Sequence, residues 1–312
     1  MKKEFSLELR ERTEECEAVL RRFLPREEGM QAQVIRAVNY SLLAGGKRLR
    51  PLLMHASYVL LMRTEDTGAE RLLRAFMAAM EMIHTFSLCH DDLPCMDGDR
   101  YRRGQESTWF RFGEDMGTLA GDALSLYAFQ LVSGTFQREL GAAERERLSG
   151  RFVRALFRLS ECSGIDGMLG GQAVDVEKTG KPLTEAELLF IYRLKTGALC
   201  AGALEIGGML AGASEQEVCL LREIGEQVGI AFQIQDDILD ETSTEEELGK
   251  PIHSDAGNGK TTYVRLHGIE GAEQEVRRLS EEALSRLRAL SPSENRRAFL
   301  EELIRYLIHR KS

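Results

Sequence analysis

Four aspartates crowd into the stretch CHDDLPCMDGD, residues 89–99. They are Asp91, Asp92, Asp97 and Asp99. On an unbroken helix Asp91 and Asp97 would lie about 240° apart, too far round to share a ligand. Pro94 stands between them and disfavours continuation of the helix through the residue before it. We therefore expect the chain to turn here and to bring Asp97 back toward Asp91.

A second acidic motif, FQIQDDILD, occupies residues 232–240. Asp236 and Asp240 are four positions apart, so both lie on one face of a helix, while Asp237 points to another side. Each acidic motif ends an apolar run that has the pattern of a helix. If the two helix ends face each other, two carboxylate clusters lie across one cavity.

Carboxylates at the carboxyl end of a helix face the negative end of its dipole, which is unfavourable by roughly 0.3–1 kcal/mol per exposed charge. A bound cation would offset this cost. Mg²⁺ fits, because one or two carboxylates, water and substrate phosphate usually hold it. An EF-hand is excluded, because the required Asp, Asn, Gly and Glu positions do not line up. The alternative is that both acidic ends are solvated surface, and the apolar run before each cluster counts against it.

The bulk composition is that of an ordinary globular chain, with 312 residues of which 43% are hydrophobic. No apolar run reaches about 18 residues and the N-terminus has no hydrophobic signal region, so we expect a soluble, unprocessed protein without membrane insertion. Six cysteines without CxxC pairing indicate reduced thiols in a cytoplasmic protein. A net charge of −9 disfavours nucleic-acid binding. Basic residues are nevertheless clumped in GGKRLRP (45–51) and RYRR (100–103), so a polyanion could bind a local pocket.

Helical signals recur along the chain. Residues 72–90 have apolar side chains at the three-and-four spacing of a buried helical stripe. TEAE (184–187), SEQE (214–217) and SPSE (291–294) match the capping box that begins a helix, the last with Pro292 at the first helical position. Strand-like alternation is almost absent and no linker divides the chain. We predict an all-α fold with one domain over residues 1–312.

Eight motifs, in this order, resemble those of the trans-polyprenyl diphosphate synthase family, most closely the bacterial enzymes that make farnesyl diphosphate. They are SLLAGGKRLRP (41–51), HDDLPCMDGDRYRRG (90–104), LAGDAL (119–124), GMLGGQAVDVE (167–177), KTGAL (195–199), FQIQDDILD (232–240), LGKP (248–251) and KTTY (260–263). The resemblance runs from about Tyr40 to the C-terminus. It implies the isoprenoid synthase fold, a bundle of about ten or more helices around a central active-site cavity, and a homodimer.

The resemblance also implies a Mg²⁺-dependent prenyltransferase that uses more than one metal ion. Such an enzyme ionises an allylic diphosphate, dimethylallyl or geranyl, adds isopentenyl diphosphate to the cation and releases a proton. Farnesyl diphosphate is the expected product, and a longer-chain geranylgeranyl synthase is an alternative. A class I terpene cyclase shares the ionisation step but needs no second diphosphate site, so the two basic motifs count against it. An inactive paralogue that serves as a dimer partner would not need both acidic clusters and the lysines.

The resemblance assigns roles by position. The principal Mg²⁺ ligands would be Asp91, Asp97 and Asp236, with Asp92 and Asp240 in support. Isopentenyl diphosphate would be held by Lys47, Arg50, His84 and Arg103. The allylic diphosphate would face Arg102, Lys195, Lys250 and Lys260. The leaving oxygen would be polarised by Thr196 and Gln233.

Each of these assignments has a plainer alternative. Either basic motif could be a solvated face, and Thr196 and Gln233 could be ordinary helical residues. Spacing alone favours His84 as a core histidine, although it lies only about 20° off the helix face of Asp91. One departure from many relatives is His253, where they have Gly after the LGK motif, and we expect it to affect the lid over the diphosphate.

Product length in this family depends partly on the side chains four and five positions before the first Asp, here Ser87 and Phe86. Helix rise places Phe86 about 7–8 Å below Asp91, a depth that suits a short product. On an ideal helix, however, Phe86 lies about 140° around from Asp91, whereas Ser87 is almost directly beneath it. We expect a bend or a neighbouring helix to bring the ring across the tunnel. The alternative is that Phe86 is an ordinary core residue.

Overall fold

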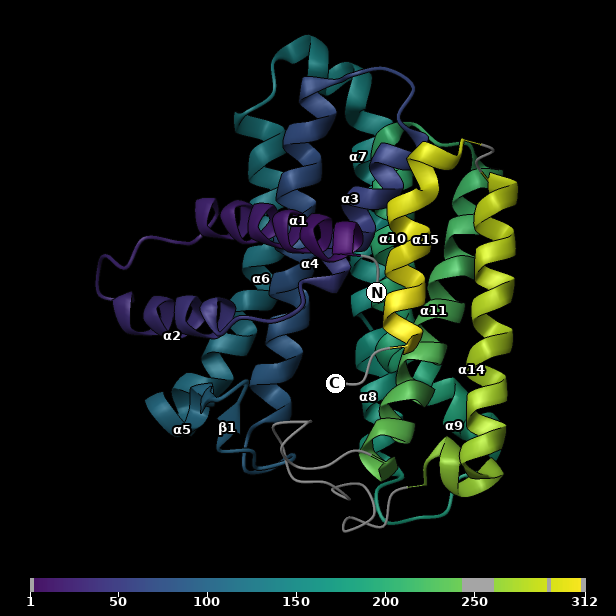
Figure 1. Ribbon diagram of the computed structural model, residues 1–312. Helices are drawn as coiled ribbons and strands as arrows, with labels where there is room; N and C mark the ends of the chain where they lie inside the picture. The colour runs from purple at the N-terminus through teal and green to yellow at the C-terminus, as the bar shows by residue number, and fades with distance from the viewer. Residues whose placement is uncertain (1–2, 243–260, 291–292, 310–312) are drawn as a thin grey trace.

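The computed structural model describes residues 3–242, 261–290 and 293–309, and these ranges are almost wholly helical (Figure 1). The helices are α1 (Lys3–Arg22), α2 (Ala32–Leu43), α3 (Leu49–Leu61), α4 (Thr67–Asp91), α5 (Thr108–Phe112), α6 (Glu114–Arg138), α7 (Ala142–Ser163), α8 (Met168–Glu177), α9 (Glu185–Ile191), α10 (Ala198–Ala211), α11 (Glu215–Thr242), α14 (Tyr263–Leu290) and α15 (Glu294–His309). A π-helix, η1 (Tyr192–Gly197), joins α9 to α10. The prediction of an all-α fold is confirmed.

Helix α10 lies at the centre of the bundle and packs against α3, α4, α7 and α11. It is buried on every side from Ala198 to Leu210, which is why its sequence is apolar all round rather than amphipathic. Thr67–Asp91 and Glu185–Ala211 are long and apolar enough to cross a membrane, but 78% of each apolar window is buried inside the molecule. Both are therefore core helices. All six cysteines are free thiols, as predicted.

Two of the predicted capping boxes form. Thr184 Oγ1 accepts from the N–H of Glu187 at 3.3 Å, and the Glu187 carboxylate accepts from the N–H of Thr184 at 2.9 Å. Ser214 and Glu217 make the same reciprocal pair at the start of α11, at 3.3 and 2.7 Å. In the third box, residues 291 and 292 lie outside the described residues, and α15 is described from Glu294.

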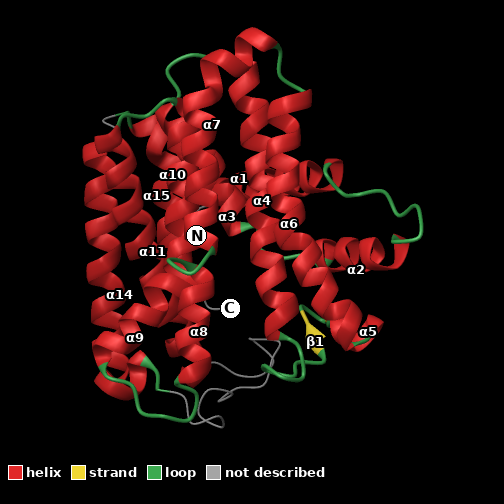
Figure 2. Ribbon diagram, turned by 180° about the vertical axis from the view of Figure 1, so that it is seen from behind, coloured by secondary structure: helices red, strands yellow, loops and turns green. Residues whose placement is uncertain are grey.

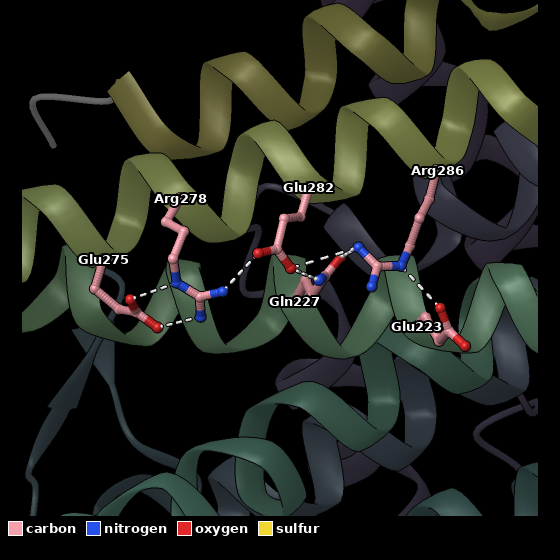
Figure 3. A network of polar contacts seen from close by, with 6 residues as sticks. All are labelled: Glu223, Gln227, Glu275, Arg278, Glu282 and Arg286. Carbon is pink, nitrogen blue, oxygen red and sulfur yellow. Dashed lines mark hydrogen bonds and ion pairs between the residues drawn. The ribbon is translucent and has the colours of Figure 1, made fainter.

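A polar network on the outside of the bundle aligns α14 with α11 (Figure 3). Arg286 of α14 donates to Glu223 of α11 at 2.8 Å, and Gln227 of α11 donates to Glu282 of α14, also at 2.8 Å. Arg278 extends the network by donating to Glu282 at 2.6 Å. Exposed pairs of this kind are worth less than about 1 kcal/mol each. They connect α14 to α11, which carries the second acidic motif.

A small hairpin interrupts the helices, formed by β1 (Tyr101–Arg102) and β2 (Gln105–Glu106). Its two turn residues, Arg103 and Gly104, have φ values of 54° and 76°. Positive φ at both central residues is the geometry of the type I′ turn, whose twist matches that of the strands. The sequence analysis identified only a basic patch here, because two-residue strands are too short to show alternation.

Candidate active site

The acidic end of α4 folds back on itself. The helix ends at Asp91, and the N–H of Asp97 donates to the carbonyl oxygen of Asp91 at 2.9 Å. The N–H of Gly98 donates to the carbonyl of Leu93 at 3.0 Å and closes the same turn around Pro94. The predicted return of Asp97 toward Asp91 is confirmed.

A cavity of about 360 Å³ lies beside this turn. It is lined by side chains of α3, α4, α6, α8 and η1 and of the loop after α4. The predicted site residues that line it are Arg50, His84, Phe86, Ser87, Asp91, Lys195 and Thr196. Apolar side chains, among them Leu93, Met96 and Met168, complete its wall. Charged groups therefore gather at one part of a largely apolar hollow.

Helix α8 connects the acidic end of α4 to the π-helix. Gln172 donates through Nε2 to Asp91 Oδ1 at 2.8 Å. Asp175, almost one turn further along α8, accepts from Lys195 Nζ at 2.6 Å. Single π-helical turns are frequent at functional sites, and here η1 presents Lys195 and Thr196 to the cavity.

The π-helix in turn contacts the second acidic motif. Thr196 Oγ1 donates to Gln233 Oε1 on α11 at 3.0 Å. Lys195, Thr196, Gln233 and Asp237 line a smaller cavity of about 100 Å³. Because Lys195 and Thr196 line both cavities, the two cavities adjoin, with Asp91 of α4 at the larger one and Asp237 of α11 at the smaller one. The acidic ends of both helices lie at the same end of the molecule (Figure 2).

Within the second motif the three carboxylates differ in their surroundings. Asp237 is buried and accepts from the Tyr192 hydroxyl at 2.5 Å and from the N–H of Tyr263 at 2.9 Å. These contacts anchor α11 to η1 and α14. Asp236 is partly exposed, whereas Asp240 is buried. The residues that the structure describes contain no group of three or more His, Cys, Asp or Glu side chains that could hold a metal ion.

The electrostatics of the α4 end nevertheless suit a cation. Burial, together with the nearby Asp97 and Asp92, raises the pKa of Asp91 to about 6, although the positive charges of Lys195 and Arg102 act to lower it. Carboxylates that repel one another in this way are stabilised by a divalent ion. Oxygen donors are also the ligands that Mg²⁺ prefers. The residues present therefore fit Mg²⁺.

We expect Asp91→Asn to stabilise the metal-free protein at pH 7 by about 1–2 kcal/mol, allowing for the partial exposure of Asp91. The folded pKa of about 6 exceeds the unfolded value, so the stability that protonated Asp91 contributes is complete below about pH 4. It is lost as the pH rises through 6. Urea unfolding in EDTA at pH 4 and 7 measures the difference. Equal pH slopes for the variant and the unmodified protein would contradict the assigned pKa.

Arg102 and Asp92, predicted to serve a diphosphate and a metal, bind each other here. Arg102 donates through Nε to Asp92 Oδ1 at 2.9 Å and through Nη2 to the same oxygen. It also reaches Asp99 at 3.2 Å. The β-hairpin thus positions Arg102 beside the acidic cluster.

The basic residues of the motif at 45–51 differ in their exposure. Lys47 is exposed and Arg50 is partly exposed, whereas Arg48 between them is fully buried. Arg48 binds Glu17 of α1 at 2.6 Å and Glu81 of α4 at 2.8 Å. Sequence analysis did not single out Arg48, because nothing in a run of basic residues marks which one turns inward.

The two basic motifs meet. Arg103 donates through Nη1 to the carbonyl of Gly45. Gly46 has a φ of 135°, and a Cβ there would lie 2.6 Å from the Arg103 guanidinium. The positive φ favours glycine at this position, and the missing Cβ leaves room for the Arg103 guanidinium.

His84 and Arg50 line the cavity, and each has a buried polar atom that makes no hydrogen bond to another described residue. Within the described part of the chain, His84 Nδ1 and Arg50 Nε are buried and have no hydrogen-bond partner. Burial holds the pKa of His84 well below its usual range, and the positive charges of Arg50 and Arg103 add to this effect. A neutral, partly exposed histidine beside arginines suits an anionic ligand.

Three residues from the sequence analysis, Lys250, His253 and Lys260, lie outside the described residues. Gln172, by contrast, is a described site residue that was not among the predicted ones. It lies in the quoted motif GMLGGQAVDVE, so the signal was present but did not distinguish this residue from its neighbours.

Comparison with known proteins identifies the family. The family described as Polyprenyl synthetase matches residues 31–301. The chain belongs to the polyprenyl synthetase family. Farnesyl diphosphate synthase of Geobacillus stearothermophilus is 40% identical over 95% of both chains, and that of Escherichia coli (strain K12) is 37% identical over 98% of this chain and 99% of its own. A chloroplastic geranylgeranyl pyrophosphate synthase of Catharanthus roseus is 38% identical over 89% of this chain and 74% of its own.

Solved structures of the family share the fold. A geranyltransferase from Legionella pneumophila has a TM-score of 0.81 at 31% identity, covering 98% of this chain and 97% of that one. A Helicobacter pylori geranyltransferase, complexed with magnesium and isoprenyl diphosphate, has a TM-score of 0.80 at 31% identity, with coverage of 99% and 97%. The isoprenoid synthase fold expected from the motifs is confirmed.

Proposed function

We propose that the protein is a Mg²⁺-dependent prenyltransferase that condenses dimethylallyl or geranyl diphosphate with isopentenyl diphosphate to give farnesyl diphosphate. The observation that carries this is the 360 Å³ cavity, where Asp91, Lys195 and Thr196 meet Arg50 and His84 beside an apolar wall. The farnesyl diphosphate synthases among its relatives support the choice of substrates.

Asp91, Asp97 and Asp236 would hold Mg²⁺, with Asp92 and Asp240 in support. Bound Mg²⁺ neutralises the charge of the leaving diphosphate. The turn at Pro94 serves this purpose by returning the backbone of Asp97 to that of Asp91.

The allylic diphosphate would lie between the acidic ends. Lys195 and Arg102, with Lys250 and Lys260, would neutralise its oxygens, and Lys195 is already held at 2.6 Å from Asp175. Thr196 and Gln233 form one hydrogen-bonded pair across η1 and α11, so they would act together on the leaving oxygen. The apolar wall would keep water from the cation.

Isopentenyl diphosphate would be held by Lys47, Arg50, His84 and Arg103. It is not ionised in the reaction and needs no metal, so arginine forks and a neutral histidine donor suffice. The partnerless Arg50 Nε and His84 Nδ1 support this position.

The test is an assay with dimethylallyl and isopentenyl diphosphates, with Mg²⁺ or with EDTA, and products identified by mass spectrometry. We expect farnesyl diphosphate with Mg²⁺ and none with EDTA. A cyclic hydrocarbon made from an allylic diphosphate alone would instead indicate a terpene cyclase. No turnover of any such substrate with Mg²⁺ present would contradict the proposal.

Phe86→Ala tests the assignment of product length. Phe86 and Ser87 both line the cavity with Asp91, so the ring occupies space that a growing chain would enter. We expect the variant to shift at least about half of the product from fifteen to twenty carbons, because removing a phenylalanine ring opens room for one isoprene unit. Phe136→Ala, which breaks the aromatic pair with Phe152 elsewhere, is the control. An unchanged product from Phe86→Ala would make Phe86 an ordinary core residue.

The remaining features of the proposal concern assembly and location. Exposed apolar side chains on α6 and α7, which include Leu126 and Phe157, support a homodimer through helical faces. Sedimentation equilibrium tests this directly. The buried core helices support a soluble protein, and we propose a cytoplasmic location and one domain over residues 1–312.

A further inference from the structure

One pair of rings faces α6 rather than the acidic cluster. Phe86 and His90 are four residues apart on α4 and therefore lie on the same side of it. Their ring centroids are 5.9 Å apart at an interplanar angle of 71°, an edge-to-face contact. Both residues line the 360 Å³ cavity. The contact with the His90 ring thus limits where the Phe86 ring can lie.

His90 is itself held by α6. Its Nε2 lies 3.1 Å from the carbonyl oxygen of Thr118, and since a carbonyl only accepts, Nε2 carries the proton. The same nitrogen is 3.6 Å from the Asp122 carboxylate. Between these two residues Gly121 provides the space, because a Cβ there would lie 2.2 Å from His90 Nε2. The histidine ring occupies a notch in α6 that any side chain at position 121 would fill.

We propose that His90 is a positioning residue for product length, which holds the Phe86 ring in the part of the cavity that a longer product would enter. The inference rests on the proposed prenyltransferase function. Asp91, at the diphosphate end of the cavity, directly follows His90 in the chain. Phe86 comes one helical turn before His90. The His90 anchor on α6 therefore sets both ends of the space in which the product grows. This explains how a ring about 140° around the ideal helix from Asp91 still limits the same cavity.

Three substitutions at position 90 separate the ring contact from the hydrogen bond. His90→Ala removes both, His90→Asn keeps a donor without a ring, and His90→Phe keeps a ring without the donor. If the ring contact positions Phe86, the ratio of twenty- to fifteen-carbon product rises about fivefold in the first two variants and stays near the original value in His90→Phe. Gly121→Ala displaces the His90 ring from the other helix and should raise the ratio as well. Phe136→Ala, away from the cavity, should leave it unchanged.

A binding measurement gives a readout that does not depend on turnover. Non-cleavable S-thiolodiphosphates of ten and fifteen carbons, titrated by calorimetry, report whether the cavity accepts the longer chain. We expect His90→Ala to bind the fifteen-carbon probe about fivefold more tightly than the unmodified protein and the ten-carbon probe equally well. A merely structural role would weaken both.

The two proposals fail in different ways. If the unmodified protein makes farnesyl diphosphate while His90→Ala keeps its product ratio and its affinity for the fifteen-carbon probe, the role of His90 is overturned and the proposed function stands. If the unmodified protein makes no prenyl diphosphate and binds neither probe, the proposed function is overturned, and the role of His90 falls with it.

Discussion

Asp91→Asn is expected to lower kcat by about a thousandfold or more, equivalent to about 4 kcal/mol of transition-state stabilisation. Asp91 is the carboxylate where the α4 turn, Gln172 and the cavity meet. An asparagine keeps the size of the side chain and can still accept from Gln172, but it loses the charge needed to bind a cation. Steady-state kinetics with saturating Mg²⁺ measure the effect, and Mg²⁺ titration followed by calorimetry should show weaker binding.

Asp166→Asn is the matched control. Asp166 is exposed in the loop before α8 and does not line the cavity, so this variant makes the same change of charge at a different place. Its kcat should stay within about twofold of the original. The combination of lost activity with the higher stability expected for metal-free Asp91→Asn at pH 7 is a specific signature. A variant that lost activity because it had misfolded would be less stable, not more. Retention of more than a tenth of kcat by Asp91→Asn would contradict a metal role for this residue.

Glu205→Gln is expected to destabilise the protein by about 3 kcal/mol, within the range for breaking a buried ion pair. Glu205 on α10 is completely buried, and its carboxylate accepts from Arg158 of α7 and, at 2.8 Å, from Arg222 of α11. Arg158 is buried as well, and Glu161 at 2.6 Å would be its remaining ion-pair partner. Glu205→Gln would therefore leave the two arginines that converge where α7, α10 and α11 meet with one carboxylate fewer to neutralise them. Thermal or urea unfolding measures the loss.

Two further variants make the stability test specific. Glu14→Gln removes an exposed pair with Arg10 on α1, and its effect should stay within about 0.5 kcal/mol. Adding Arg158→Met to Glu205→Gln removes the buried charge that has lost one of its two carboxylate partners and should restore part of the loss. If Glu205→Gln unfolds at the same midpoint as the unmodified protein, the buried network contributes nothing to stability.

Much of this protein follows from local patterns in its sequence. Apolar spacing predicted the long helix over residues 72–90, and the capping boxes at 184–187 and 214–217 formed as expected. The turn that returns Asp97 to Asp91 followed from Pro94 alone. Each of these features depends on residues within a few positions of one another, where backbone geometry restricts the outcome. The order of the motifs then indicated the family and the residue types that its chemistry needs.

The tertiary structure decided everything that depends on residues distant in the chain. It buried Arg48 and left Lys47 exposed, although the two are adjacent and both basic. It placed Gln172 on Asp91 and joined Thr196 to Gln233. It also brought Phe86 to the cavity, against the angle expected on an ideal helix, where α6 packs on α4. Helical periodicity states which face of a helix is buried, but the partner of that face is chosen by the packing of the whole bundle.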